Sequence, residues 1–285
     1  CGDQTPLIVN AALPAADPYS MDFLLRLFVD HGIKPGVVVI EVSPETIKLA
    51  AAFQPVQVTR ILTWKELPEA MSDLIEGRQY SRLMSSRLIP IFLYRKELLT
   101  FLIGLSPPYV SLAGGIEPYP DPPSASTDPS MLAAPELQVL SQEEKDAAMN
   151  RILSTVPSVR GWLRNFRISG QNPQHLESML EYLRDHHMAA ILVGVPVAKP
   201  HFECYSAKIN QEFLSYMSLL CQKYGCHFVD YRNRLPDDLF HDTHHLNPNG
   251  NIVFSQILVE DVLCEVWSQR SKAYHQAGHL QPPNS

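Results

Sequence analysis

The chain has 285 residues, of which 45% are hydrophobic and 19% are charged, a balance typical of a globular protein with a substantial core. Its formal net charge is −7, so it lacks the excess of Lys and Arg that binds nucleic acid, and we expect no nucleic-acid partner. No long apolar run predicts a membrane span within these residues. The five cysteines form no C-x-x-C pair, and we interpret them as free thiols rather than zinc ligands.

The N-terminal part of the chain predicts a β-α-β unit. Apolar runs at residues 6–10 and 37–40 indicate two strands, and the second is apolar on both faces, as in a parallel sheet. Between them, apolar residues recur at the helical spacing i, i+3, i+4 and i+7, namely Met21, Leu24, Leu25 and Phe28. The first residue is Cys1 rather than Met, and almost no chain precedes the first strand. We therefore expect residues 1–50 to be the first part of an N-terminally truncated α/β domain.

The middle of the chain interrupts this pattern. Residues 51–104 show helical periodicity and predict a helical insertion. Residues 105–135 hold eight prolines, which are incompatible with a regular helix or a central strand. We expect this stretch to form a Pro-rich loop or a lid between two halves of one domain.

The second half of the chain returns to strands that alternate with helices. We expect strands at residues 189–195 and 226–230, helices around residues 176–183 and 209–220, and a last helix that begins at Asn247-Pro248. Residues 136–270 thus form the second part of the α/β domain, and residues 271–285 a disordered tail. Alternation on both sides of an insertion predicts a three-layer α/β sandwich with a mostly parallel sheet.

The most informative polar cluster follows the last predicted strand. Ligands of open α/β sheets bind beyond the carboxyl ends of the strands, and here Asp242 stands three residues before His245. At that spacing the carboxylate can accept the imidazole Nδ1–H, which leaves Nε2 available as a base. Two alternatives remain: His245 caps the following helix, or it belongs to a merely polar loop.

Residues 240–250 fit the pattern F-x-D-x-x-H-L-x-x-x-G, which resembles the last conserved block of SGNH (GDSL-like) hydrolases and acyltransferases. Within this superfamily, an exported or membrane-associated branch is similar to polysaccharide O-acetyltransferases. The second block of that branch and the strand after it are similar to residues 9–45 here, VNAALPAADPYSMDFLLRLFVDHGIKPGVVVIEVSPE. The segments ILVGVPVAKPHFECY and CHFVDYRNRLPDDLF are similar to the approach to the last block. The resemblance spans residues 5–50 and 160–268 and implies an SGNH or flavodoxin-like fold.

The resemblance also implies roles for individual residues. His245 would be the general base and Asp242 its orienter, while backbone N–H groups at Ala12 and Ala15 would bind the oxyanion. No metal and no organic cofactor is implied. The same branch implies an extracytoplasmic or membrane-anchored protein, with any anchor upstream of this chain.

The nucleophile is the component that the sequence does not supply. The Gly-(Asp/Ser)-Ser turn of the family should precede residue 6, so we expect the serine to be missing from this chain. Ser43, after the strand at residues 37–42, is the best internal alternative. An alanine also stands in place of the second-block glycine, and Gly194-Val195-Pro196 replaces the third-block asparagine.

Three functions follow as hypotheses. The first is a serine esterase or O-acyltransferase that acts on a small-molecule or carbohydrate ester, inactive without its serine. The second is a non-catalytic protein of the same fold that binds a glycan or a protein. The third is a metal-dependent hydrolase that uses ligands from the last loop and one strand end, namely His241, Asp242, His244, His245 and either Glu41 or Asp230.

Overall fold

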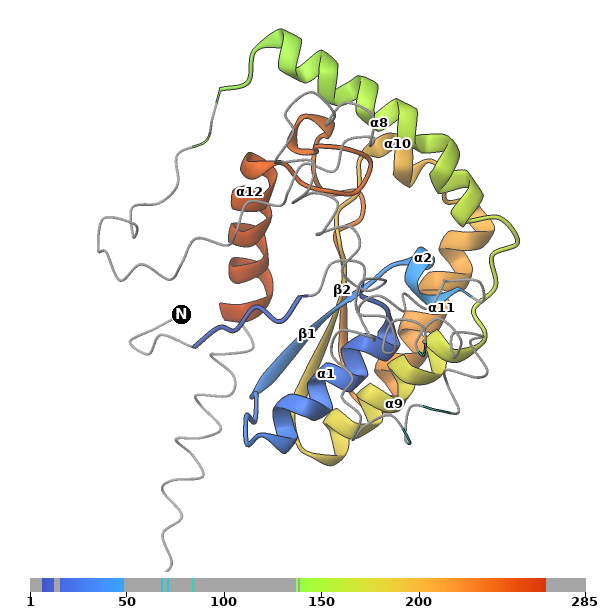
Figure 1. The fold of residues 1–285 in the computed structure, drawn as a ribbon, viewed down its shortest axis with the longest axis vertical. Coiled ribbons are helices and arrows are strands. Elements are labelled where there is room, and N and C mark those ends of the chain that lie inside the picture. The colour runs from blue at the N-terminus through green and yellow to red at the C-terminus, as the bar shows by residue number, and fades with distance from the viewer. Residues whose placement is uncertain are drawn as a thin grey trace, which may run out of the picture.

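The computed structural model describes residues 7–12, 16–48 and 139–264, with residues 68, 71, 84 and 137 in isolation. Within these residues the fold is mixed α/β, with three parallel strands in the order β1-β2-β3 (Figure 1). The elements before the insertion are α1 (Pro18–Asp30), β1 (Val37–Val42) and α2 (Pro44–Ile47). Those after it are α8 (Gln142–Trp162), α9 (Gln171–Asp185), β2 (Ala189–Gly194), α10 (Lys199–Phe202), α11 (Ala207–Tyr224), β3 (His227–Asp230), η3 (Asp237–Leu239), α12 (Pro248–Leu258) and η4 (Val259–Leu263).

The sheet joins parts of the chain that are far apart in the sequence. Val37 pairs with Ala189 at one end of β1, and Val42 pairs with Gly194 at the other. Because the three strands are parallel, their carboxyl ends reach the same edge of the sheet, where the following loops meet. The second strand of the predicted β-α-β unit, β1, and the later strands thus belong to one sheet.

Helices pack against both faces of the central strand. Ala190 and Leu192 contact one core cluster, built mainly with α1, α9 and α11, whereas Ile191 and Val193 contact a second cluster built with α12 and η4. The two groups of helices lie on opposite sides of the sheet (Figure 1). Burial of each large aliphatic side chain contributes about 1.5–3 kcal/mol, so these clusters fix the strand that leads to the site.

The sequence correctly predicts the described helices α1, α9, α11 and α12 and the three strands. It does not predict α8, whose N-cap Ser141 forms a capping box with Glu144. In this box the Ser141 hydroxyl accepts the Glu144 N–H, and the Glu144 carboxylate accepts the Ser141 N–H. The spacing S-x-x-E was the signal that could have revealed this helix.

The expected strand at residues 6–10 is wrong over the residues described. Residues 7–12 have no regular secondary structure, and Leu7 is 91% exposed. Three consecutive apolar residues cannot bury themselves without a partner strand, and β1 pairs only with β2 in the described sheet. The helical insertion at residues 51–104, the Pro-rich segment at 105–135 and the tail at 271–285 lie outside the described residues, apart from residues 68, 71 and 84. Among the helices described, none has the length and apolarity to cross a membrane.

Candidate active site

The loop that carries Asp242 and His245 is closed by two apolar side chains at its ends. Phe240 and Leu246 form an antiparallel bridge, and the His241 N–H donates to the His245 carbonyl over 2.8 Å. Phe240 is fully buried, in a cluster with Ile152 of α8 and with residues of α12. The apolar positions of the sequence pattern are therefore the anchors of a short polar loop.

The helix that follows fixes the other end of this loop. The Asn247 side chain accepts the Gly250 N–H at the start of α12 and donates to the Asp238 carbonyl, at 2.9 and 2.8 Å. A side chain at Gly250 would overlap the carbonyl oxygen of Leu239, which itself accepts the Asn247 N–H. The glycine of the pattern is thus required by close backbone contact.

Asp242 and His245 form the hydrogen bond that their spacing predicts. The Asp242 Oδ2 atom lies 2.7 Å from His245 Nδ1, and Oδ1 accepts the backbone N–H groups of His244 and His245, each at 2.9 Å. Because a carboxylate only accepts, Nδ1 carries the proton and Nε2 holds the lone pair in the neutral ring. The two backbone bonds hold the carboxylate in place, so it orients the imidazole of His245.

The hydrogen bond between Asp242 and His245 shifts the pKa of each group so that its charged form is favoured. Burial by itself raises the pKa of Asp242, but the hydrogen bonds from His245 and from the two backbone amides outweigh it and hold the pKa well below its ordinary value. The hydrogen bond to Asp242 raises the pKa of His245, partly offset by burial. Glu41, at the carboxyl end of β1, interacts electrostatically with His245, and burial raises the pKa of Glu41.

His244 packs between this pair and a second polar network. Its ring lies 4.1 Å from the His245 ring and 5.9 Å from the His201 ring, measured between centroids, and the indole of Trp162 contacts its edge. Burial, with the charge of His245, lowers the pKa of His244 to about 4. His244 is therefore neutral at physiological pH.

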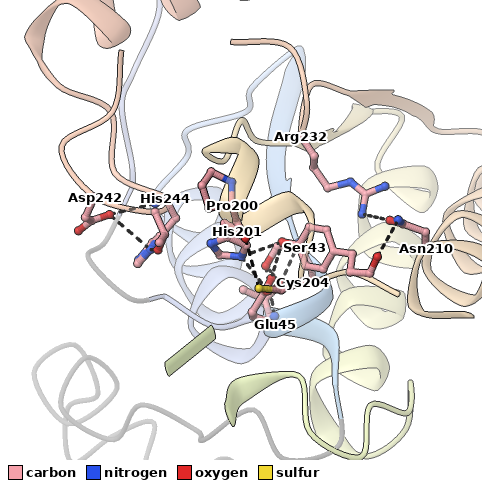
Figure 2. A network of polar contacts seen from close by, with 12 residues as sticks. Ser43, Glu45, Pro200, His201, Cys204, Asn210, Arg232, Asp242 and His244 are labelled. Atoms are coloured by element: carbon pink, nitrogen blue, oxygen red, sulfur yellow. Dashed lines mark hydrogen bonds and ion pairs between the residues drawn. The ribbon is translucent and has the colours of Figure 1, made fainter. Parts of the chain in front are cut away.

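The second network joins α10 to α2 beneath His244. His201 Nε2 lies 3.0 Å from Glu45 Oε1, and the Tyr205 hydroxyl donates to Glu45 Oε2 over 3.1 Å. Burial raises the pKa of Glu45, but the bond from His201 and its charge reverse this, and the net pKa is lowered. Figure 2 shows the His201 ring between His244 and Glu45. A second carboxylate–histidine pair thus stands directly behind the first.

A buried arginine fixes the loops on the other side of α10. Arg232 makes a two-bond ion pair with Asp230, at 2.8 Å for each contact, and donates to Asn210 of α11. Its carbonyl accepts the Val197 N–H, and the Thr243 carbonyl accepts the Ala198 N–H. The loop after β2 is thereby tied both to the end of β3 and to the Asp242 loop.

The other residues predicted for the site have different surroundings. The Ser43 hydroxyl accepts the Thr46 N–H and donates to Thr46 Oγ1 as the N-cap of α2. The Ala12 N–H already donates to Asn10 Oδ1, and Ala15 lies outside the described residues. The roles predicted for Ser43, Ala12 and Ala15 stay predictions.

Among the metal ligands of the third hypothesis, Asp230 is committed to Arg232. Asp242, His244 and His245 each offer a ligand atom, and these atoms lie within 4.8 Å of one another. His241 does not belong to this group, although its backbone closes the loop. The residues that could hold a metal are therefore centred on His244.

Sequence reasoning missed Glu45, His201 and Tyr205. All follow carboxyl ends of predicted strands, but each is a single polar residue in a loop or short helix, with no spacing that marks a pair. Glu45 and His201 are 156 residues apart, so only the pairing of β1 with β2 brings them together.

A family model that carries no functional description matches residues 134–266. The matched range holds α8 to η4 and therefore includes His201, Asp242, His244 and His245, whereas Glu41 and Glu45 fall outside it. Searches of curated proteins and of solved structures give no match.

Proposed function

We propose that the protein is an SGNH-like serine esterase or O-acyltransferase in which His245 is the general base and Asp242 orients it. The observation that carries the proposal is the 2.7 Å contact between His245 Nδ1 and Asp242 Oδ2, in a loop at the carboxyl edge of a parallel sheet. This contact turns Nε2 of a half-exposed imidazole outward from its orienting carboxylate, as a base requires.

The proposed reaction follows from that arrangement. A serine hydroxyl transfers its proton to His245 Nε2 while its oxygen attacks the ester carbonyl, and the imidazolium is stabilised by ionised Asp242. Collapse of the intermediate passes the proton from His245 to the departing alcohol and leaves an acyl-serine. Water or a sugar hydroxyl then accepts the acyl group by the reverse sequence. The serine would come from a segment outside the described residues, since Ser43 is the cap of α2.

The proposal includes a three-layer α/β sandwich, and the packing of helices on both faces of β2 supports it. Helices α1, α9 and α11 on one face and α12 on the other are the arrangement that a three-layer sandwich requires. In such a fold the loops after β1, β2 and β3 converge on one site. Their polar residues here are Glu45, His201 and Asp242.

The test is to treat the full-length protein with a fluorophosphonate probe and to map the labelled peptide by mass spectrometry. We expect a single labelled serine, with labelling reduced in His245→Gln and in Asp242→Asn. His241→Gln is the matched control, because it removes a neighbouring histidine whose backbone alone takes part in the loop. Absence of serine labelling in the folded protein would refute the proposal.

A non-catalytic protein of the same fold is the second candidate, and one observation favours it. Within the described residues, both the Ser43 hydroxyl and the Ala12 N–H are committed to local hydrogen bonds rather than available to a substrate. Such a protein would bind a glycan or a protein partner with an affinity that is insensitive to His245→Gln. It would remain unlabelled by the probe at every serine.

A further inference from the structure

One polar atom in the second network has no partner within the described residues. The His201 side chain is only 3% exposed, so its Nδ1 atom is shielded from solvent. Within the described residues this atom makes no hydrogen bond. Glu45 only accepts hydrogen bonds, so Nε2 must carry the proton, and in the neutral ring Nδ1 is a lone pair. A buried lone pair without a donor costs about 1–3 kcal/mol, which calls for an explanation at this position.

His201, His244, which packs against it, and His245, which packs against His244, share one arrangement. In each ring one nitrogen is held by an oxygen: His201 Nε2 by Glu45, His244 Nδ1 by Thr243 at 3.1 Å, and His245 Nδ1 by Asp242. Each bond leaves the other nitrogen of its ring for a different partner. Histidines that bind a metal characteristically use their second nitrogen in this way, because the oxygen fixes the ring and strengthens the ligand.

The spacing of the rings is also compatible with a shared cation. Two imidazoles on one zinc ion, at about 2.0–2.1 Å from each nitrogen, have ring centres about 4.5–5.5 Å apart. The observed separations are 4.1 Å for His244 with His245 and 5.9 Å for His201 with His244, one slightly short and one slightly long. Among the described residues, the ligand atoms that already lie within 4.8 Å of one another belong to Asp242, His244 and His245, so the partly exposed rings of His244 and His245 must turn towards His201 to share one ion with it.

We propose that His201, His244 and His245 bind a divalent transition-metal cation of the zinc class through His201 Nδ1, His244 Nε2 and His245 Nε2. Imidazole is a preferred ligand of such cations, and two of the rings are backed by ionised carboxylates. The cation supplies the partner that His201 Nδ1 otherwise lacks.

Metal binding has a consequence for the proposed reaction, and this part rests on the proposed function. The Nε2 lone pair of His245 cannot bind a cation and accept a proton from serine at the same time. The metal-bound protein is therefore an inhibited state, and the metal site regulates the ester chemistry.

The experiment titrates Zn²⁺, and separately Co²⁺, into the purified full-length protein by calorimetry and by visible absorption. We expect one ion per chain and the d–d bands of cobalt bound by nitrogen, without the near-ultraviolet band that cysteine ligands produce. His201→Gln, which keeps a donor for Glu45 but loses the Nδ1 ligand, and His244→Gln should each weaken binding by at least about tenfold. Glu45→Gln should weaken binding about 10- to 100-fold, as loss of an outer carboxylate does.

Two matched variants control for ordinary surface histidines. His241→Gln and His227→Gln remove exposed histidines outside the cluster and should leave the affinity unchanged. Circular dichroism checks that His201→Gln is folded, and the partly exposed His244→Gln provides the test if it is not. Affinity that survives both His201→Gln and His244→Gln, or no stoichiometric binding, would overturn the proposal.

A last measurement separates this inference from the proposed function. If the protein shows ester hydrolysis, Zn²⁺ should inhibit it with a concentration dependence that follows the calorimetric affinity. Zinc binding without any serine labelling would support the metal site and refute only the proposed esterase or acyltransferase function. Serine labelling without zinc binding would refute only the metal site.

Discussion

The hydrogen bond between Asp242 and His245 makes a prediction that needs no knowledge of the substrate. Replacement of Asp242 by Asn removes the charge but keeps the size of the side chain. Two unit charges about 4 Å apart interact by about 4 kcal/mol at an effective dielectric constant of about 20, and by about 1 kcal/mol in water. The His245 side chain is 61% exposed, so the interaction is screened towards the lower value. We therefore expect the pKa of His245 to fall in Asp242→Asn, because the imidazolium loses an interaction worth on the order of 1 kcal/mol.

The assay is a pH titration of the histidine ring signals by NMR, with His245 assigned by comparison with His245→Gln. In the wild-type protein the pKa of His245 should lie above its ordinary value, as the bond to Asp242 requires. Asp238→Asn is the matched control, because only the backbone carbonyl of Asp238 supports the loop. An unchanged His245 pKa in Asp242→Asn would refute the pairing and, with it, the basis of the proposed function.

Three further predictions concern stability. Gly250→Ala should destabilise the protein by about 1–3 kcal/mol in urea unfolding, because the new methyl group overlaps the Leu239 carbonyl; no loss would contradict the tight contact. Arg232→Met should cost about 3 kcal/mol, since it leaves Asp230 without its ion pair, and a second change of Asp230 to Asn should recover part of this. The pKa of His244 is lowered to about 4, so its neutral form contributes stability above pH ~6.5 that is lost as the pH falls towards 4. His244→Asn should remove roughly 1–2 kcal/mol of that acid sensitivity, a value discounted for partial exposure, and equal pH profiles for both proteins would refute it.

The described fold follows from the sequence wherever periodicity and caps agree. Helix α12 begins at Pro248 with Asn247 as its N-cap, and the apolar runs at β1 and β2 become strands of one parallel sheet. The run at residues 7–9 shows where this reasoning fails, since burial depends on a partner strand that local sequence does not reveal. Helix α8 was missed because its apolar residues are sparse, although its capping box is local.

The candidate site was predictable only in its local half. Asp242 and His245 are three residues apart, so the spacing itself carries the hydrogen bond. The pair of Glu45 with His201 depends on which strands are neighbours, and no property of either residue alone encodes that. Arg232 was missed for the same reason: its burial against aromatic rings and Asn210 depends on the packing of α11.

The 152-residue separation between Val37 and Ala189 has a consequence for the order of folding. Helices α8 to α12 and strands β2 and β3 contact one another over shorter distances in the sequence, whereas β1 must close a very long loop before it pairs with β2. We expect the region from α8 to η4 to form early and β1 to dock last. Asp242 and His245 would then be paired before Glu45 reaches His201, so the second carboxylate–histidine pair exists only in a completely folded chain.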